Sequence, residues 1–129
     1  MKRTQYASEY QKSRSYAPAV VTEGGKIVWL AGLLAHEDEK GNSLAGDFTG
    51  QVRCIFRKMA RQMEEAGGSL DDVVTMTGYI TEVRYNADFV EVRKEFFKEE
   101  CYPASTLVTV QALNRPEALV EVTATAVVP

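Results

Sequence analysis

The stretch Glu65-Ala-Gly-Gly-Ser-Leu-Asp-Asp-Val-Val74 joins the end of a predicted helix to the start of a predicted strand. Before it, from about Thr49 to Ala66, apolar residues recur at steps of three and four, as on the buried face of a helix. Gly67 and Gly68 end this helix, because the position after a helix often needs a left-handed backbone. After them, Val73 to Val83 predicts a long strand. The helical stripe consists of Val52, Ile55, Phe56, Met59, Met63 and Ala66.

Further elements are predicted on both sides of this stretch. A second helix is expected at about Asn86 to Glu99, and two closing strands at Ser105–Leu113 and Leu119–Val128. Near the start of the chain, Val20–Thr22 and Ile27–Ala31 predict a β-hairpin around a glycine turn. The order ββαβαββ indicates an α+β fold in which both helices cover one face of the sheet.

The face of the sheet opposite the helices is expected to be rich in threonine and poor in charge. A solvated sheet face usually carries Lys and Glu, but here Glu121 is the only charge at its centre. We therefore expect this face to be buried against other subunits. The helix-covered face is assigned Val74, Met76, Ile80, Val108, Val110 and alternate residues from Val120 to Ala126, and the opposite face Val73, Thr75, Thr77, Tyr79, Thr109, Thr123 and Thr125.

Length and composition narrow the class of protein. The 129 residues suit one domain, residues 1–129, in which residues 1–15 are loosely specified. A net charge of −3 argues against nucleic-acid binding, and the single histidine, His36, excludes a multi-histidine metal site. No signal-like or membrane-spanning apolar run occurs, and two distant cysteines do not make a disulfide framework. We expect a cytoplasmic protein with neither a nucleic-acid nor a membrane partner.

Glu121 is the most interesting residue for chemistry. It lies in mid-strand between two valines, where isolated burial of a charge would be costly. Two interpretations stay open: a cross-strand hydrogen bond at a subunit contact, or an acid–base or water-orienting group in an interfacial pocket. Ser105 and Thr106 can donate hydrogen bonds at a strand start, but neither has an activating base. The acidic loop after His36 is interpreted as solvated, not as a metal site.

Several short segments occur in a characteristic order over nearly the whole chain from Ser15 onward. They are Tyr16-Ala-Pro-Ala-Val20, Val28-Trp-Leu-Ala-Gly32, Glu65–Val74, Glu95-Phe-Phe97 with Tyr102-Pro-Ala104, and Leu119-Val-Glu-Val-Thr-Ala-Thr-Ala-Val127. The ordered set resembles the Rid family, also called YjgF/YER057c/UK114 or L-PSP endoribonuclease-like.

The resemblance implies a chorismate-mutase-like α+β fold, with two helices on one face of a mixed sheet, and a homotrimer. In such a trimer three sheets form a central β-barrel, and small-molecule clefts lie between the subunits. The best-known members hydrolyse reactive enamines and imines, such as 2-aminoacrylate, to keto acids and ammonia without a cofactor or metal.

The chain departs from the family at one functional position. Ser105 stands where catalytic members carry an arginine, whose guanidinium suits the bidentate binding of a substrate carboxylate. Leu107 replaces a frequent cysteine, whereas Tyr16, Gly32 and Glu121 match pocket positions of the family. The resemblance therefore implies Glu121 as the catalytic residue, and as substrate-binding residues Tyr16, Gly32, Ser105, Thr106 and Leu107.

Two hypotheses of function stay open. One is hydrolysis of an enamine or imine other than 2-aminoacrylate, with Glu121 positioning the water. The other is a non-catalytic metabolite-binding or regulatory trimer that uses the same cleft. Ribonuclease activity, which some family names suggest, fits poorly with the net charge and the single histidine. Arg115, between the closing strands, is a candidate for the missing positive charge.

Overall fold

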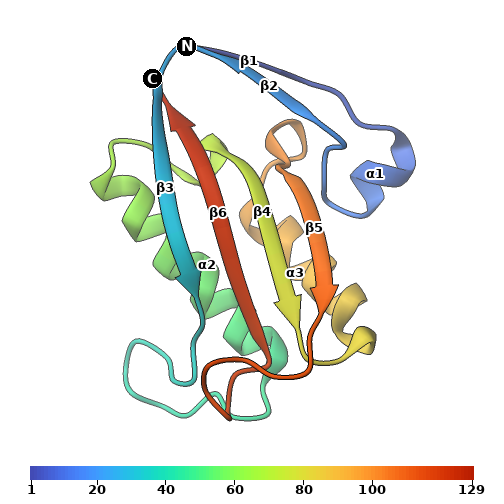
Figure 1. Ribbon diagram of the computed structural model, residues 1–129, viewed down its shortest axis with the longest axis vertical. Helices are drawn as coiled ribbons and strands as arrows, with labels where there is room; N and C mark the ends of the chain where they lie inside the picture. The colour runs from blue at the N-terminus through green and yellow to red at the C-terminus, as the bar shows by residue number, and fades with distance from the viewer.

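The main sheet has four strands, in the order β3 (Lys26–Leu33), β6 (Val120–Val128), β4 (Val73–Ile80) and β5 (Ala104–Thr109). The structure is a computed structural model that describes residues 1–129. Strand β6 is antiparallel to both of its neighbours, whereas β4 and β5 run parallel, so the sheet is mixed. Two helices, α2 (Phe48–Glu65) and α3 (Asn86–Phe96), lie behind it (Figure 1). The predicted α+β fold, with both helices on one face of a mixed sheet, is confirmed.

A smaller layer is formed by the first 23 residues. Strand β1 (Lys2–Gln5) pairs antiparallel with β2 (Val20–Glu23), and the short helix α1 (Glu9–Ser13) lies between them in the chain. This layer sits beside the β5 edge of the main sheet (Figure 1), where Ala17 forms an isolated bridge with Ala104. Arg3 fixes β1 to the body of the protein by donating to the carbonyls of Asp71 and Cys101.

The predicted end of the first long helix is confirmed in detail. Gly67 follows α2 with a φ of +86°, and its N–H donates to the Glu64 carbonyl. The N–H of Gly68 donates to the carbonyl of Met63. These bonds satisfy carbonyl groups that would otherwise be orphaned at the helix end, and the left-handed backbone favours glycine.

The core lies between the helices and the sheet. Phe56 of α2 is fully buried, and its ring contacts the rings of Phe89, Phe96 and Phe97 at centroid distances of 5.3 to 6.0 Å. From the sheet side, Met76, Val120 and Val122 complete the same cluster. None of the helices is long and apolar enough to cross a membrane.

The predicted hairpin near the start of the chain is wrong. Strand β2 hydrogen-bonds to β1 and not to β3, which pairs only with β6. Gly24 and Gly25, both with positive φ, turn the chain sharply between the two sheets. A Cβ at Gly25 would come within 2.6 Å of the Val128 carbonyl oxygen, so the turn packs against the end of β6 instead of closing a hairpin.

The predicted alternation along β4 is also wrong at its start. Val73 lies opposite Ala126 and Thr75 opposite Thr125, so β4 uses one residue more than β6 does. This bulge turns Val73 into the core, where it is fully buried, and leaves Val74 half-buried. The strand ends at Ile80, before Val83, which is exposed.

The predicted faces of β5 are reversed, and the strand ends at Thr109. Its register with β4 places Leu107 opposite Gly78, on the helix side, and Val108 opposite Tyr79, on the other side. A Cβ at Gly78 would lie 2.8 Å from Cδ1 of Leu107, so the missing side chain of Gly78 makes room for Leu107. Strands β5 and β6, although consecutive, do not pair, because β4 lies between them.

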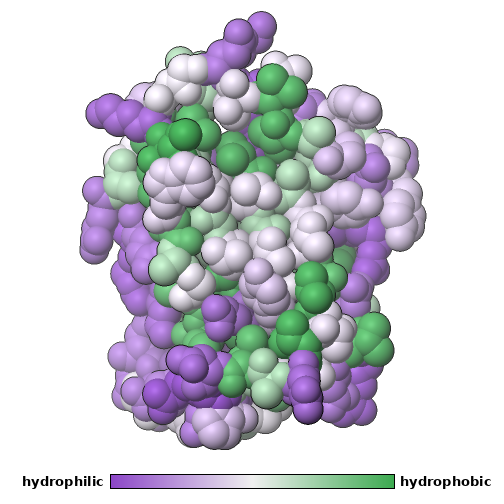
Figure 2. All heavy atoms as spheres, viewed as in Figure 1, coloured by the Kyte–Doolittle hydropathy of each residue, from purple (hydrophilic) through white to green (hydrophobic).

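The sheet face without helices carries the predicted threonines of β4 and β6. Thr75 lies opposite Thr125, Thr77 opposite Thr123 and Tyr79 opposite Glu121. Trp29 of β3, beside Thr125, is 77% exposed. Figure 2 shows that the centre of this face is nearly neutral in hydropathy, whereas strongly hydrophilic side chains gather at its margins. We call it the open face.

Candidate functional site

A cavity of about 150 Å³ lies where α3, β5 and the segment after α1 meet. We call it the arginine pocket. Its lining combines polar and charged side chains with apolar side chains from α3 and β5. Its lining residues are Arg14, Tyr16, Asn86, Val90, Arg93, Ser105 and Leu107.

Arg93 is the central residue of the arginine pocket. It belongs to α3, is only 3% exposed, and its guanidinium lies over the ring of Phe89. Its Nη1 donates to Oγ of Ser105 at 2.5 Å, and its Nε donates to Oγ of Ser15 at 3.0 Å. Burial lowers the pKa of Arg93 to about 10, so the side chain is positively charged at neutral pH.

The segment after α1 is shaped to receive Arg93. Ser15 has a φ of +56°, and this left-handed backbone turns its hydroxyl toward α3. The hydroxyl accepts from Arg93 and donates to the carbonyl of Val90 at 2.9 Å. The carbonyl of Arg14 accepts a further bond from Nη2 of Arg93, and the Arg14 side chain donates to Oδ1 of Asn86.

A second hollow, of about 350 Å³, lies on the open face around Glu121. We call it the Glu121 pocket; its other lining residues are Gly32, Tyr79, Leu113 and Thr123. A Cβ at Gly32 would lie 2.3 Å from Oε2 of Glu121, so the carboxylate occupies space that only a glycine leaves free. No ion pair or hydrogen bond within the chain engages this carboxylate. It is therefore free to bind a water molecule or a ligand.

The two pockets lie on opposite faces of the sheet. Ser105 is opposite Met76 of β4, whose side chain is buried on the helix side. Glu121 is opposite Tyr79, on the open face. One copy of the chain therefore cannot bring Ser105 and Glu121 to the same small ligand.

The structure divides the predicted site residues between these pockets. Tyr16, Ser105 and Leu107 line the arginine pocket, whereas Gly32 and Glu121 line the Glu121 pocket. Thr106 lies opposite Thr77 on the open face and lines neither pocket. Arg115 also lies in neither, and its Nε is 3.6 Å from a carboxylate oxygen of Glu117.

The sequence prediction missed four residues of the arginine pocket: Arg14, Asn86, Val90 and Arg93. One signal for Arg93 was available. It follows Phe89 by four residues and precedes Phe97 by four, so it falls on the apolar stripe of its own helix. An arginine on a buried stripe needs partners, and these come from Ser15 and Ser105.

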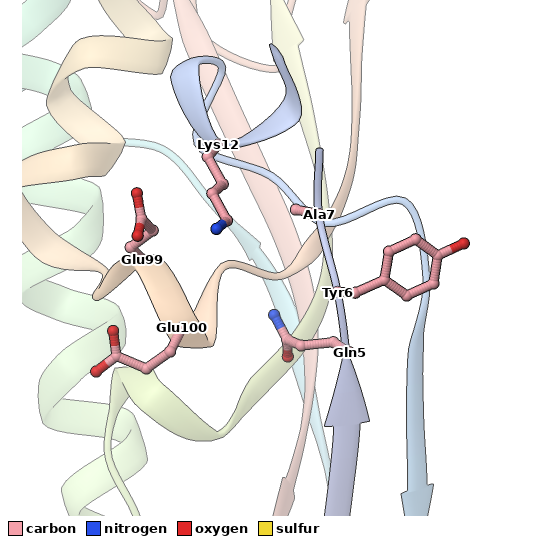
Figure 3. A pocket seen from close by; sticks show the side chains of 6 residues that line it. All are labelled: Gln5, Tyr6, Ala7, Lys12, Glu99 and Glu100. Atoms are coloured by element: carbon pink, nitrogen blue, oxygen red, sulfur yellow. The ribbon is translucent and has the colours of Figure 1, made fainter. Parts of the chain in front are cut away.

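A third hollow, of about 320 Å³, lies between the N-terminal layer and residues 99–101 (Figure 3). The side chain of Lys12 reaches toward it from α1, and the ring of Tyr6 points away. Glu99 and Glu100 at its rim are exposed. It contains none of the predicted site residues, and no group of three or more His, Cys, Asp or Glu side chains forms a metal site anywhere in the chain.

Comparison with known proteins agrees with the fold and the arrangement of these elements. The family model described as Endoribonuclease L-PSP matches residues 7–128. A RutC family protein of Pyrococcus abyssi is 33% identical over 102 residues, which are 79% of this chain and 79% of that protein. A second RutC family protein, from Pyrococcus horikoshii, is 31% identical over 86% of this chain and 85% of its own length.

Solved structures give the same result. The crystal structure of RidA from an Antarctic Psychrobacter superposes with a TM-score of 0.72 at 30% identity, covering 88% of each chain. A Rid-family protein of unknown function from Yersinia pestis has the same fold, with a TM-score of 0.86 over 99% of this chain and 100% of its own, at 23% identity. The chain therefore belongs to the Endoribonuclease L-PSP family, also known as the Rid or YjgF/YER057c/UK114 family.

Proposed function

We propose that this protein is a cytoplasmic homotrimer that hydrolyses a small imine or enamine to a carbonyl compound and ammonia, without a cofactor or metal. The observation that carries the proposal is the Glu121 carboxylate, which lies unengaged over Gly32 in a hollow of the open face. Membership of the Rid family supports it, because the best-known members catalyse this class of reaction.

The chemistry needs one group that accepts and then returns a proton. Glu121 accepts a proton from water while the water oxygen bonds to the imine carbon and the C=N π electrons move to nitrogen. Glu121 then returns this proton to the nitrogen, which gives a carbinolamine with a hydroxyl and an –NH2 group. The carboxylate next accepts the hydroxyl proton and passes it to the nitrogen as the C–N bond breaks, so that ammonia leaves. The water oxygen becomes the carbonyl oxygen. An enamine first gains a proton on carbon and becomes an iminium ion, which loses an N–H proton to give the imine.

The separation of the two pockets supports an active site between subunits. The open face combines few charges with exposed Trp29 and Ile27, which is typical of a surface that has a partner. A second copy packed on this face brings its own β5 edge, and with it an arginine pocket, toward Glu121. Three copies related by rotation then close a ring with three equivalent sites.

Ammonia release from a panel of imines and enamines, generated in the assay, tests the proposal. Glu121→Gln keeps the size of the side chain but removes the base, and should lower turnover by about 10²-fold or more. The matched control is Glu64→Gln, on the exposed face of α2, which should leave turnover unchanged.

Turnover that survives in Glu121→Gln would contradict the assigned role. Tight binding of a metabolite without hydrolysis of any compound in the panel would favour the alternative, a non-catalytic binding or regulatory trimer.

A further inference from the structure

Arg93 is a buried cation without a buried anion. All three of its acceptors are neutral oxygens, from Ser15, Ser105 and the backbone of Arg14. None of the ion pairs in the chain includes it. Burying a charge without a counter-charge is costly, so such groups are usually paired or bind a ligand of opposite sign.

A second guanidinium lines the same cavity. Arg14 also forms no ion pair, and Asn86 holds its side chain in place by accepting a hydrogen bond. No Asp or Glu is among the lining residues, so the pocket carries two positive charges and no negative one. Two positive charges close together repel each other and destabilise the folded protein unless an anion lies between them.

The remaining donors suit an oxygen ligand. A guanidinium has five N–H groups, and Arg93 uses three of them within the chain. Tyr16 also lines the cavity. Val90 and Leu107 form the apolar part of the wall, against which a short carbon chain can pack. The volume of about 150 Å³ equals that of about five water molecules, which limits the ligand to a small molecule.

We infer that Arg93 and Arg14 together bind the carboxylate of a small ligand in the arginine pocket. Ser105 of β5 carries no charge, so the positive charge that binds the ligand comes from Arg93 of α3 and from Arg14, which follows α1. The ligand is therefore an acid, although position 105 carries a serine and not an arginine. The identification of this ligand as the substrate rests on the proposed function, but the binding site itself does not.

Binding of an unreactive probe tests this inference on the assembled wild-type protein. Propionate should bind saturably in a calorimetric or NMR titration, and propionamide, which has the same shape without the charge, should bind at least about tenfold more weakly. Equal binding of the two compounds would overturn the inference. Tighter binding of inorganic phosphate than of propionate would overturn the choice of a carboxylate.

Variants locate the site. Arg93→Gln and Arg14→Gln should each weaken propionate binding by about tenfold or more. Arg53→Gln is the matched control, because Arg53 is a half-buried arginine of α2 that lies outside the pocket and pairs with Glu95. Arg14→Gln keeps the test decisive if Arg93→Gln fails to fold, since Arg14 is only half-buried.

A positional swap gives an independent test. The double variant Arg93→Ser/Ser105→Arg moves the guanidinium from α3 to β5, and it should recover the propionate binding that Arg93→Ser loses. Glu121→Gln keeps both arginines, so it should still bind propionate more tightly than propionamide whatever its turnover. If the wild-type protein binds propionate but hydrolyses no imine, only the proposed reaction is contradicted. If it does not prefer propionate to propionamide, only this inference is contradicted.

Discussion

Gly32 shows how a single residue shapes the proposed active site. Its missing side chain leaves room for the carboxylate of Glu121, since a Cβ would lie 2.3 Å from Oε2. The Glu121 side chain is flexible and half-exposed, so it can move aside without unfolding the sheet. Position 32 therefore controls where the carboxylate points, and has little part in stability.

Gly32→Ala should lower turnover strongly and leave the fold intact. Displacing a catalytic group by about 1 Å can reduce the rate by about 10²-fold. Steady-state kinetics and thermal unfolding of Gly32→Ala, beside the exposed neighbour variant Ala31→Ser, separate the two effects. Unchanged turnover in Gly32→Ala would mean that Glu121 does not act from this position.

The residues of the site differ in how far sequence could predict them. Glu121, Gly32, Tyr16 and Ser105 were predicted as site residues from an ordered motif, and each of them lines one of the two pockets. Arg93 was missed because its role depends on how α3 packs against β5. The apolar stripe of α3 indicates that Arg93 is buried, but no local pattern predicts that its side chain meets Ser105 of β5.

At the scale of elements, helices were easier to predict than strand pairing. The apolar stripe and the glycine pair defined α2 to within about a residue, because helical periodicity and its end signal are local. The pairing of β2 with β1 and the insertion of β4 between β5 and β6 depend on contacts far apart in sequence. The bulge at Val74 could not be predicted either, because Val73 and Val74 are both apolar and either of them could face the core.

The bulge makes a prediction about two adjacent valines. Val73→Ala removes buried methyl groups from the core and should lower the free energy of unfolding by about 2 kcal/mol. Val74→Ala is the matched control and should cost much less, because Val74 is only half-buried. Denaturant unfolding of both variants measures the difference. The reverse order of stabilities would show that the strand alternates without a bulge.

At the scale of the molecule, the open face accounts for the proposed trimer. Thr75, Thr125 and Trp29 lie side by side across β4, β6 and β3, and Trp29 is 77% exposed in a single chain. Such a surface is explained if other copies cover it. The threonines of β4 and β6 were correctly predicted to lie on this face. Val108 of β5 was predicted to lie on the helix-covered face, but it lies on the open face as well.

Thr125→Lys should convert the trimer to a folded monomer. A lysine at the centre of the contact would place three ammonium groups in a barrel that excludes water, which is costly. Analytical ultracentrifugation should give three chain masses for the wild type and one for the variant. The control Gln62→Lys, exposed on α2, should remain a trimer. A wild-type protein that sediments as a monomer would refute the proposed assembly.

In the proposed trimer, each active site combines Glu121 of one copy with the arginine pocket of another. Co-expression of Arg93→Gln and Glu121→Gln chains, each inactive as a homotrimer, tests this shared site. Random mixing leaves an intact pair at about one interface in four, so the mixture should regain about a quarter of wild-type turnover. If the mixture stays as inactive as its parents while mixed trimers are present, the two pockets do not form one site.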